Sequence, residues 1–392
     1  MRIRTQPLLL LACGLVLSCS RHVQEPRAVP ARQAHGETGL QEERLAEYVS
    51  AMPIEEKVRQ IFLVNLEGNT EFHPVEFDGA GDALIPGGYL FFSYNIGDSF
   101  GQTAAFVRSV KDYARSAGAI TPLAAVDQEG GYVSRLRGIT DDLPSQERVA
   151  AEYGPDAAHR LYSEQAEQMA RLGFDLNLAP VVEVLSSENA DFLDTRSFGS
   201  KEQVLSYGAA AIRGYQEHGV AAVLKHFPGN SNTDPHTGLP EITLSAQELE
   251  ESAVSVFAEL LRCRPEGVLM SHARTAAFDS AMPACLSEYW VQDVLRARLA
   301  YSGLILSDDI FMDALGKNGF PPARAAVLAL SAGVDMIMLS EKRFARSAEA
   351  LVQHAQENPP FAARIDEAVF RVLSFKLRHG LFFLPGTSDG EE

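Results

Sequence analysis

The chain has 392 residues, of which 46% are hydrophobic, and this is enough to build the core of one large α/β domain or two ordinary ones. Its formal net charge is -18. This acidic balance argues against nucleic acid and anionic membrane surfaces as partners, because both are bound through basic faces.

The N-terminal residues have the pattern of an export signal. Two arginines precede an apolar stretch over about residues 8–17, which is too short to cross a bilayer as a helix. The stretch ends in VLSC, which resembles a bacterial lipoprotein signal with Cys19 as the lipidated first residue of the mature protein. We therefore expect a signal peptide over residues 1–18, export, and a lipid anchor as the sole membrane attachment. Cys13 is a second candidate, and an ordinary secretory signal or an unprocessed anchor remains open.

Polar, proline-bearing sequence follows over residues 19–38 and predicts a flexible tether. From about residue 40, strand-like apolar runs alternate with helical patterns, which predicts a domain over 39–385 and a tail over 386–392. The strand-like runs lie at 60–64, 88–92, 118–126, 174–184, 221–224, 267–270, 303–306 and 334–339, and the helical patterns lie at 103–117, 155–172, 202–217, 246–262, 288–300, 321–331, 343–357 and 362–378.

The alternation predicts the fold class. Strand–helix units in succession indicate a parallel sheet with helices outside it. About eight such units fit an α/β fold with a single (β/α)8 barrel of the TIM type. A doubly wound open sheet is the alternative, but no GxGxxG turn follows the first strand.

Several apolar runs end in charged or histidine clusters. Because the carboxyl ends of parallel strands meet at one face of a barrel, these clusters predict a polar site at that face. A solvated rim is the alternative interpretation. The clusters are Asp127 with Glu129, Lys225 with His226, Ser271 with His272, Ser307 with Asp308 and Asp309, and Ser340 with Glu341; Arg196 follows a further run after a loop.

Two kinds of chemistry suit such a rim. Carboxylates together with a proton donor suit glycoside hydrolysis. A metal-dependent barrel hydrolase is the competitor, since His226, His236, His272 and Asp308 could be ligands. Against a metal, no strand carries HxH, and Lys225 would place a cation beside the ion. A serine esterase is disfavoured because no GxSxG elbow is present.

The sequence resembles glycoside hydrolase family 3, and within it the single-domain β-N-acetylhexosaminidases of the peptidoglycan-recycling type. The matching segments occur in family order and extend over about residues 40–380. They are MPIEEKVRQIF at 52–62, GGYLFFSYNI at 87–96, AVDQEGG at 125–131, RSFG at 196–199, KHFPG at 225–229, DPH at 234–236, VLMSHA at 268–273 and LILSDDIFMDAL at 304–315.

The resemblance implies roles for individual residues. It makes Asp308 the nucleophile of a retaining exo-β-N-acetylglucosaminidase, with Asp234 and His236 as the acid/base dyad. It implies no cofactor and no metal, and a monomer acting on GlcNAc-containing glycans such as peptidoglycan fragments or chitooligosaccharides. Asp309 is the expected helix cap, and a core position is the alternative for His272. The implied substrate-binding residues are Asp127, Arg196, Lys225, His226 and His272.

Other functions remain open at this point. They are another family-3 β-glycosidase such as a β-glucosidase, a phosphorylase, the metal-dependent hydrolase, and a sugar-binding lipoprotein without catalysis. Three departures from the family pattern bear on the choice. Asn230 and Ser231 stand where His-Gly is usual, Pro235 replaces the serine of DSH in a loop about two residues shorter, and Tyr132 stands where Arg is common.

The remaining cysteines, Cys263 and Cys285, have no metal-site spacing. They could pair in an oxidising compartment, but we expect two separately buried thiols.

Overall fold

The structure is a computed structural model, and it describes residues 31–74, 84–234, 238–341 and 344–386. The predicted signal peptide with Cys19, the predicted acid/base residue His236, and residues 387–392 lie outside these ranges. The chain divides into two compact units, residues 1–41 and residues 42–392.

Helix α1, Ala31–Ala51, begins inside the segment predicted to be a tether. Residues 31–38, which were predicted to belong to the tether, are thus helical. Alanine, glutamine and glutamate recur through ARQAHGETGLQEERLAEYVSA, and their high helix propensity outweighs the two glycines. None of the helices in the described ranges is both long and apolar enough to cross a membrane.

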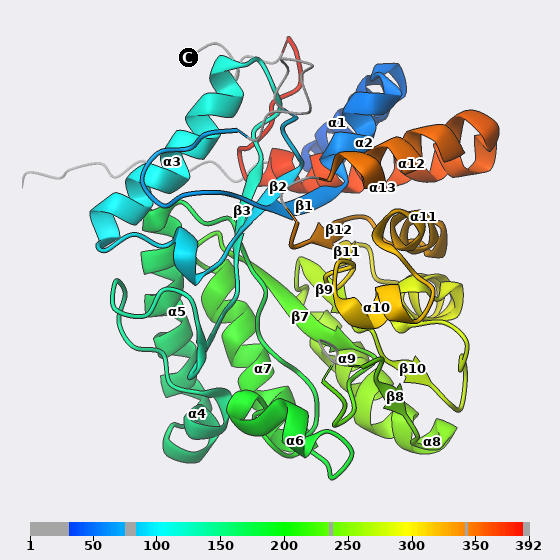
Figure 1. Ribbon diagram of the computed structural model, residues 1–392. Coiled ribbons are helices and arrows are strands. Elements are labelled where there is room, and N and C mark those ends of the chain that lie inside the picture. Colours follow the sequence, from blue (N-terminus) through cyan, green and yellow to red (C-terminus); the bar gives the residue numbers. More distant parts are fainter. Residues whose placement is uncertain (1–30, 75–83, 235–237, 342–343, 387–392) are drawn as a thin grey trace, which may run out of the picture. The chain divides into compact units, whose positions relative to one another are not determined.

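Eight parallel strands form the centre of the second unit (Figure 1). Their order is β11-β9-β7-β6-β3-β2-β1-β12, and a parallel bridge between Leu306 and Met336 connects the two ends of this order. The sheet is therefore a near-closed barrel, as predicted, and each predicted run overlaps one of its strands. The strands are β1 (Phe62–Asn65), β2 (Gly88–Phe91), β3 (Leu123–Val126), β6 (Leu176–Asn177), β7 (Ala221–Phe227), β9 (Gly267–Met270), β11 (Leu304–Leu306) and β12 (Ile337–Leu339).

Helices flank the strands, and their starts follow from local chemistry. Ser99, Ser200 and Ser245 each accept a hydrogen bond from a backbone N–H of the first turn of α3, α7 and α8. Among the described residues between β1 and β2 there is no helix, so this unit departs from a regular alternation. The helices are α2 (Ile54–Gln60), α3 (Phe100–Ser116), α4 (Gln146–Glu152), α5 (Pro155–Leu172), α6 (Ala190–Leu193), α7 (Lys201–Gln216), α8 (Ala246–Leu249), α9 (Ser255–Leu260), η6 (Tyr289–Arg298), α10 (Asp313–Lys317), α11 (Pro322–Ala332), α12 (Ala345–Glu357) and α13 (Pro359–Arg378).

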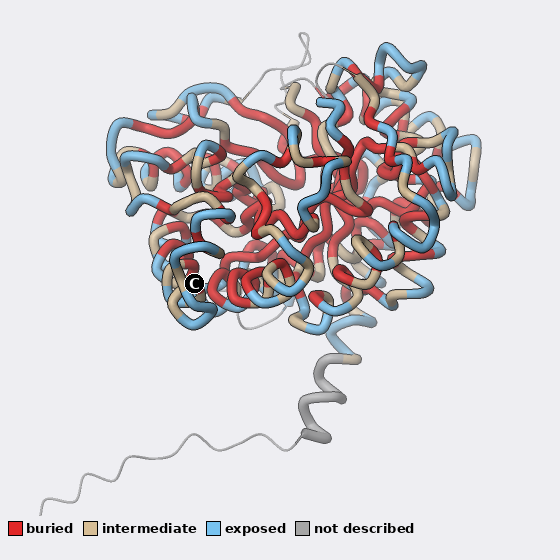
Figure 2. The backbone as a smooth tube through the Cα atoms, turned by 90° about the horizontal axis from the view of Figure 1, so that it is seen from below, coloured by how far each residue is buried: buried red, intermediate tan, exposed pale blue. Residues whose placement is uncertain are grey.

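Alternate strand residues fill the inside of the barrel. They form one apolar cluster, while the residues between them belong to the larger cluster packed under the helices. The residues of these strands are buried, and Figure 2 shows buried residues gathered toward the middle of the second unit. The inward residues nearest the carboxyl ends are Leu63, Leu90, Ala125, Val223, Leu269, Leu306 and Met338. Because side chains alternate along a strand, the residue two positions after each of these also points inward.

Helix α13 contributes Phe375 to the same interior cluster, and the next residue, Lys376, is completely buried. Its Nζ donates a hydrogen bond to Gln60 Oε1 at 2.7 Å. Burial lowers the pKa of Lys376 to about 7, and the charge of Asp175 opposes this shift only in part.

Candidate active site

The carboxyl ends of the strands bring the predicted residues to one mouth of the barrel. Asp127, Lys225 and Asp308 each lie two positions after an inward apolar residue. Strands β3 and β11, which lead to Asp127 and Asp308, are four strands apart in both directions around the ring. The two carboxylates therefore face each other across the mouth, and Lys225 lies on a strand between them.

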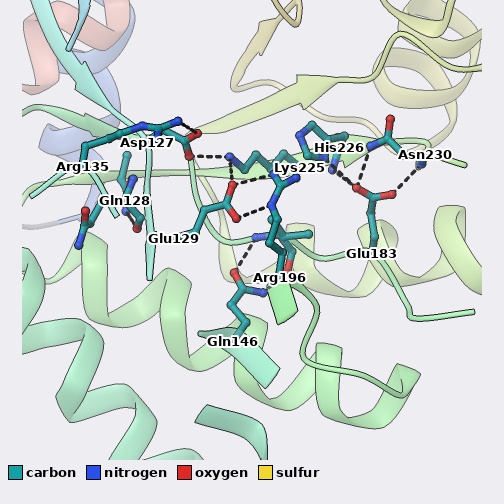
Figure 3. A network of polar contacts seen from close by, with 12 residues as sticks. Asp127, Gln128, Glu129, Arg135, Gln146, Glu183, Arg196, Lys225, His226 and Asn230 are labelled. Carbon is teal, nitrogen blue, oxygen red and sulfur yellow. Dashed lines mark hydrogen bonds and ion pairs between the residues drawn. The ribbon is translucent and has the colours of Figure 1, made fainter. Parts of the chain in front are cut away.

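Lys225 and Arg196 are held by a pair of carboxylates (Figure 3). The Nζ of Lys225 lies 2.7 Å from Asp127 Oδ1 and 2.5 Å from Glu129 Oε1. Arg196 donates through Nε and Nη2 to the two oxygens of Glu129, both at 2.8 Å. Arg135 extends the network to the other oxygen of Asp127, at 3.6 Å. Three of the predicted sugar-binding residues thus form one network.

Glu129 is the centre of this network. Burial alone would raise the pKa of its carboxyl group, but Lys225 and Arg196 outweigh burial and hold the pKa well below its usual range. The guanidinium of Arg196 also lies over the ring of Phe192, 5.4 Å from its centroid. Fixed in this way, the cations of Lys225 and Arg196 can orient sugar hydroxyl groups without first being ordered.

His226 belongs to a second polar group, although it follows Lys225 directly. The pairing of β7 with β9 shifts register between Lys225 and Phe227, and the Lys225–His226 peptide bond is cis. His226 Nδ1 lies 2.7 Å from Glu183 Oε1, and Glu183 also accepts from the backbone N–H and the side-chain amide of Asn230, at 2.6 and 3.0 Å. The predicted pair therefore has two different sets of partners.

Asp308 is a half-buried carboxylate. Burial would raise its pKa, but the charges of His272, His226 and Lys225, together with a 2.8 Å hydrogen bond from the backbone N–H of Asp309, lower the pKa below its usual value. An ionised carboxylate is what a nucleophile requires. Asp308 does not cap a helix: α10 begins at Asp313 and its N-cap position is Met312.

Asp309 and His272 support the loop that carries Asp308. Asp309 Oδ1 accepts from the backbone N–H groups of Phe311 and Ser340, so it stabilises the loop rather than a helix. His272 is fully buried, with Nε2 2.9 Å from the carbonyl oxygen of Asp309 and Nδ1 3.2 Å from Cys285 Sγ. Both ring nitrogens have protein partners, which favours the alternative of a core histidine for His272 over a sugar-binding one.

The predicted dyad is described only in part. Asp234 is exposed, and its backbone carbonyl accepts a hydrogen bond from the N–H of Gly238 at 3.0 Å. Residues 235–237, and with them His236, lie outside the described ranges. The pairing of Asp234 with His236 therefore stays a prediction.

The structure adds residues that the sequence did not single out as sugar-site residues. Glu129 and Arg135 join the network around Asp127, and Glu183 holds His226. The signal for Glu183 was present, because it is the charged residue near the carboxyl end of the run 174–184. Arg135 follows β5 (Val133–Ser134), well after the run that ends near Asp127, so no strand-end pattern marks it.

No metal-binding constellation is found within the described ranges, where no three His, Cys, Asp or Glu side chains are grouped as ligands. Cys263 and Cys285 are both free thiols, as expected, but only Cys285 is buried. The imidazoles of His226 and His272 are directed at Glu183 and at Asp309 rather than at a shared point.

Comparison with known proteins places this geometry among glycosidases. Residues 53–375 match the family model described as "Glycosyl hydrolase family 3 N terminal domain". A β-hexosaminidase from Alkalilimnicola ehrlichii is 32% identical over 283 residues, covering 70% of this chain and 78% of that protein. A β-hexosaminidase from Methylococcus capsulatus is 35% identical over 258 residues, covering 64% and 75%.

Solved structures agree with the match. A family 3 β-N-acetylglucosaminidase from a Paenibacillus species superposes with a TM-score of 0.77 at 27% identity, over 86% of this chain and 65% of that one. A β-N-acetylhexosaminidase from Beutenbergia cavernae superposes with a TM-score of 0.73 at 29% identity, over 83% of this chain and 98% of that one.

Proposed function

Because the chain belongs to glycoside hydrolase family 3, we propose that this β-N-acetylhexosaminidase is a retaining exo-enzyme that removes terminal β-linked GlcNAc through a covalent intermediate on Asp308. The observation that carries the proposal is the arrangement at the barrel mouth, where Asp308 faces the network of Asp127, Lys225 and Glu129. The (β/α)8 barrel of the TIM type is the fold that we assign to this near-closed sheet.

The sugar would be held on the side of the mouth formed by β3, β6 and β7. Asp127 keeps oxygen atoms available as acceptors, while Lys225 and Arg196 supply donors that Glu129 keeps in place. His226 supplies a ring nitrogen from the same strand end. Acceptors and donors fixed before binding discriminate sugar hydroxyl positions, because a mispositioned hydroxyl leaves a buried polar group unpaired.

The chemistry would proceed in two displacements. The Asp308 carboxylate forms a bond to the anomeric carbon while the bond to the leaving oxygen breaks, and His236 gives its proton to that oxygen. His236 then takes a proton from water, the water oxygen bonds to the anomeric carbon, and Asp308 is released. Asp234 would orient the imidazole of His236, as the carboxylate of a catalytic triad does.

The names of the relatives support GlcNAc as the sugar, and peptidoglycan fragments or chitooligosaccharides are our proposed substrates. The test compares aryl N-acetyl-β-glucosaminide with aryl β-glucoside, each with and without phosphate, and repeats both assays with a chelator. We expect hydrolysis of the first substrate alone, unaffected by chelator or phosphate. Asp308→Asn should abolish turnover, and full activity of that variant would exclude the mechanism.

Export and lipid anchoring at Cys19 are a separate proposal, supported by the sequence of residues 1–19. Mass spectrometry of the membrane-bound protein should find a diacylglyceryl cysteine at the mature N-terminus. An unmodified residue 19 within an intact chain would refute it.

A further inference from the structure

We propose that Glu183 is a positioning residue that couples the sugar site to the acid/base loop, by holding both the ring of His226 and the start of the loop leading to Asp234. The inference rests on the proposed function, since it assigns His226 to the sugar and that loop to proton transfer. The hydrogen bonds of the Glu183 carboxylate go to His226 and Asn230, and none of them reaches Asp308.

The geometry around Glu183 is built rather than incidental. Its side chain is only 3% exposed, and four N–H groups converge on its two oxygens: His226 Nδ1 at 2.7 Å, the His226 backbone N at 3.4 Å, the Asn230 backbone N at 2.6 Å and Asn230 Nδ2 at 3.0 Å. The chain reaches this position through Gly229, whose φ of 132° is unfavourable for any residue with a side chain. The loop therefore turns at Gly229 in the direction that brings Asn230 onto the carboxylate.

The contact to His226 decides which ring nitrogen is free. A carboxylate only accepts, so Nδ1 of His226 must carry its proton toward Glu183. Nε2 is then the nitrogen left to meet a sugar hydroxyl group. Glu183 thus sets which ring nitrogen of His226 is free as well as the direction of the ring.

The contact to Asn230 fixes the start of the loop beside an open space. A cavity of about 360 Å³ adjoins this point, lined by Glu183, Gly229 and Asn230 and by apolar side chains such as Ile242 and Phe257. Because this space is open, the loop start can shift into it when the hydrogen bonds to Glu183 are lost. Asn230, one of the departures from the family pattern, supplies two of the four donors.

The replacement Glu183→Gln separates these roles from simple packing. A glutamine keeps the volume of the side chain, but its amide group accepts hydrogen bonds through one oxygen only. Its NH₂ group takes the place of the other carboxylate oxygen and therefore faces an N–H donor of His226 or Asn230. We expect kcat/KM on an aryl N-acetyl-β-glucosaminide to fall about 10- to 100-fold, as for loss of hydrogen bonds to a charged group. Both KM and kcat should change, because sugar binding and loop position are affected together.

Double variants show through which partner Glu183 acts. Its effect on KM should be largely absent in a His226→Ala background, and its effect on kcat should be largely absent in an Asn230→Ala background. The matched control is Glu266→Gln: Glu266 accepts from His379 at 3.0 Å and from Arg378 at 3.2 Å, and it directly precedes β9 at the opposite end of that strand from Ser271. This control should keep wild-type kcat and KM.

Wild-type kinetic constants in Glu183→Gln, or effects fully additive with both backgrounds, would overturn the inference. If Glu183→Gln does not fold, Asn230→Ala alone carries the test, and unchanged kcat in that variant is the refuting result. Failure of the proposed function would instead appear as inactivity of the wild-type protein. GlcNAc binding, measured by calorimetry, would then be compared between wild type and Glu183→Gln, and equal affinity would refute the inference.

Discussion

The buried amine of Lys376 allows a quantitative test of how the unfolding free energy depends on pH. Its Nζ is completely buried and donates to Gln60 Oε1, and burial lowers its pKa from 10.5 to about 7. Between these two values the unfolded chain binds one more proton than the folded protein at this position. The stability contributed by this residue therefore rises as the pH rises from about 7 toward 10.5.

The magnitude follows from the shift. A fall in pKa from 10.5 to about 7 corresponds to at most about 5 kcal/mol, because each unit is worth about 1.4 kcal/mol. Over the practical window from about pH 7 to about pH 9, the gain in unfolding free energy is about 2 kcal/mol. In Lys376→Met the amine is absent, so this gain should be missing from the variant.

The effect is measured by urea unfolding of the wild type and of Lys376→Met at several pH values. Unfolding is followed by the fluorescence of Trp290, which is buried and is the single tryptophan of the chain. The difference between the two unfolding free energies should change by about 2 kcal/mol across the window, in favour of the wild type at high pH. Gln60→Leu is the control, since it removes the hydrogen-bond partner and keeps the amine, and its curve should run parallel to the wild type. A constant difference between wild type and Lys376→Met would refute the reasoning.

Three further outcomes follow from the site. His236→Ala should slow hydrolysis most for poor leaving groups, and equal losses on activated and unactivated aryl glycosides would argue against its role as acid. Glu129→Gln leaves Lys225 and Arg196 buried without their shared carboxylate, so the unfolding free energy should fall by about 3 kcal/mol and KM should rise; an unchanged melting temperature would contradict this. Because the pKa of Asp308 lies below its usual value, activity should persist to the acidic side of pH 4 in kcat/KM profiles, and a limb assigned to Asp308 well above that pH would contradict the shift.

The fold could be predicted from the sequence because most of the barrel strands are short apolar runs. The strands β7 and β9 show this well: AAVL and GVLM have no polar residue until the barrel mouth, where Lys225 and Ser271 begin the site. The start of α1 was not predicted because its first residues are polar and show no hydrophobic periodicity. Helix propensity determines the structure of this segment.

Partners within the site could not be predicted in the same way. Lys225 and His226 are adjacent in sequence, but the register shift of β7 gives them separate carboxylates, and no periodic pattern signals such a shift. His272 has the strand-end position of a ligand, yet Cys285 and the carbonyl of Asp309 occupy both of its nitrogens. Pairings of this kind depend on loops that meet only after the barrel has formed.

The ion pairs at the barrel mouth also have a consequence for the effect of salt. Dissolved ions screen exposed charges beyond about 8 Å at physiological ionic strength, but they screen buried pairs much less. The side chains of Glu129 and Lys225 are 1% and 3% exposed, whereas Glu129, Glu183 and Asp335 are the only buried acidic residues in the described part of this chain, whose net charge is -18. The sugar-binding geometry should therefore be insensitive to salinity, while the long-range repulsion between molecules of this protein should weaken as salt is added.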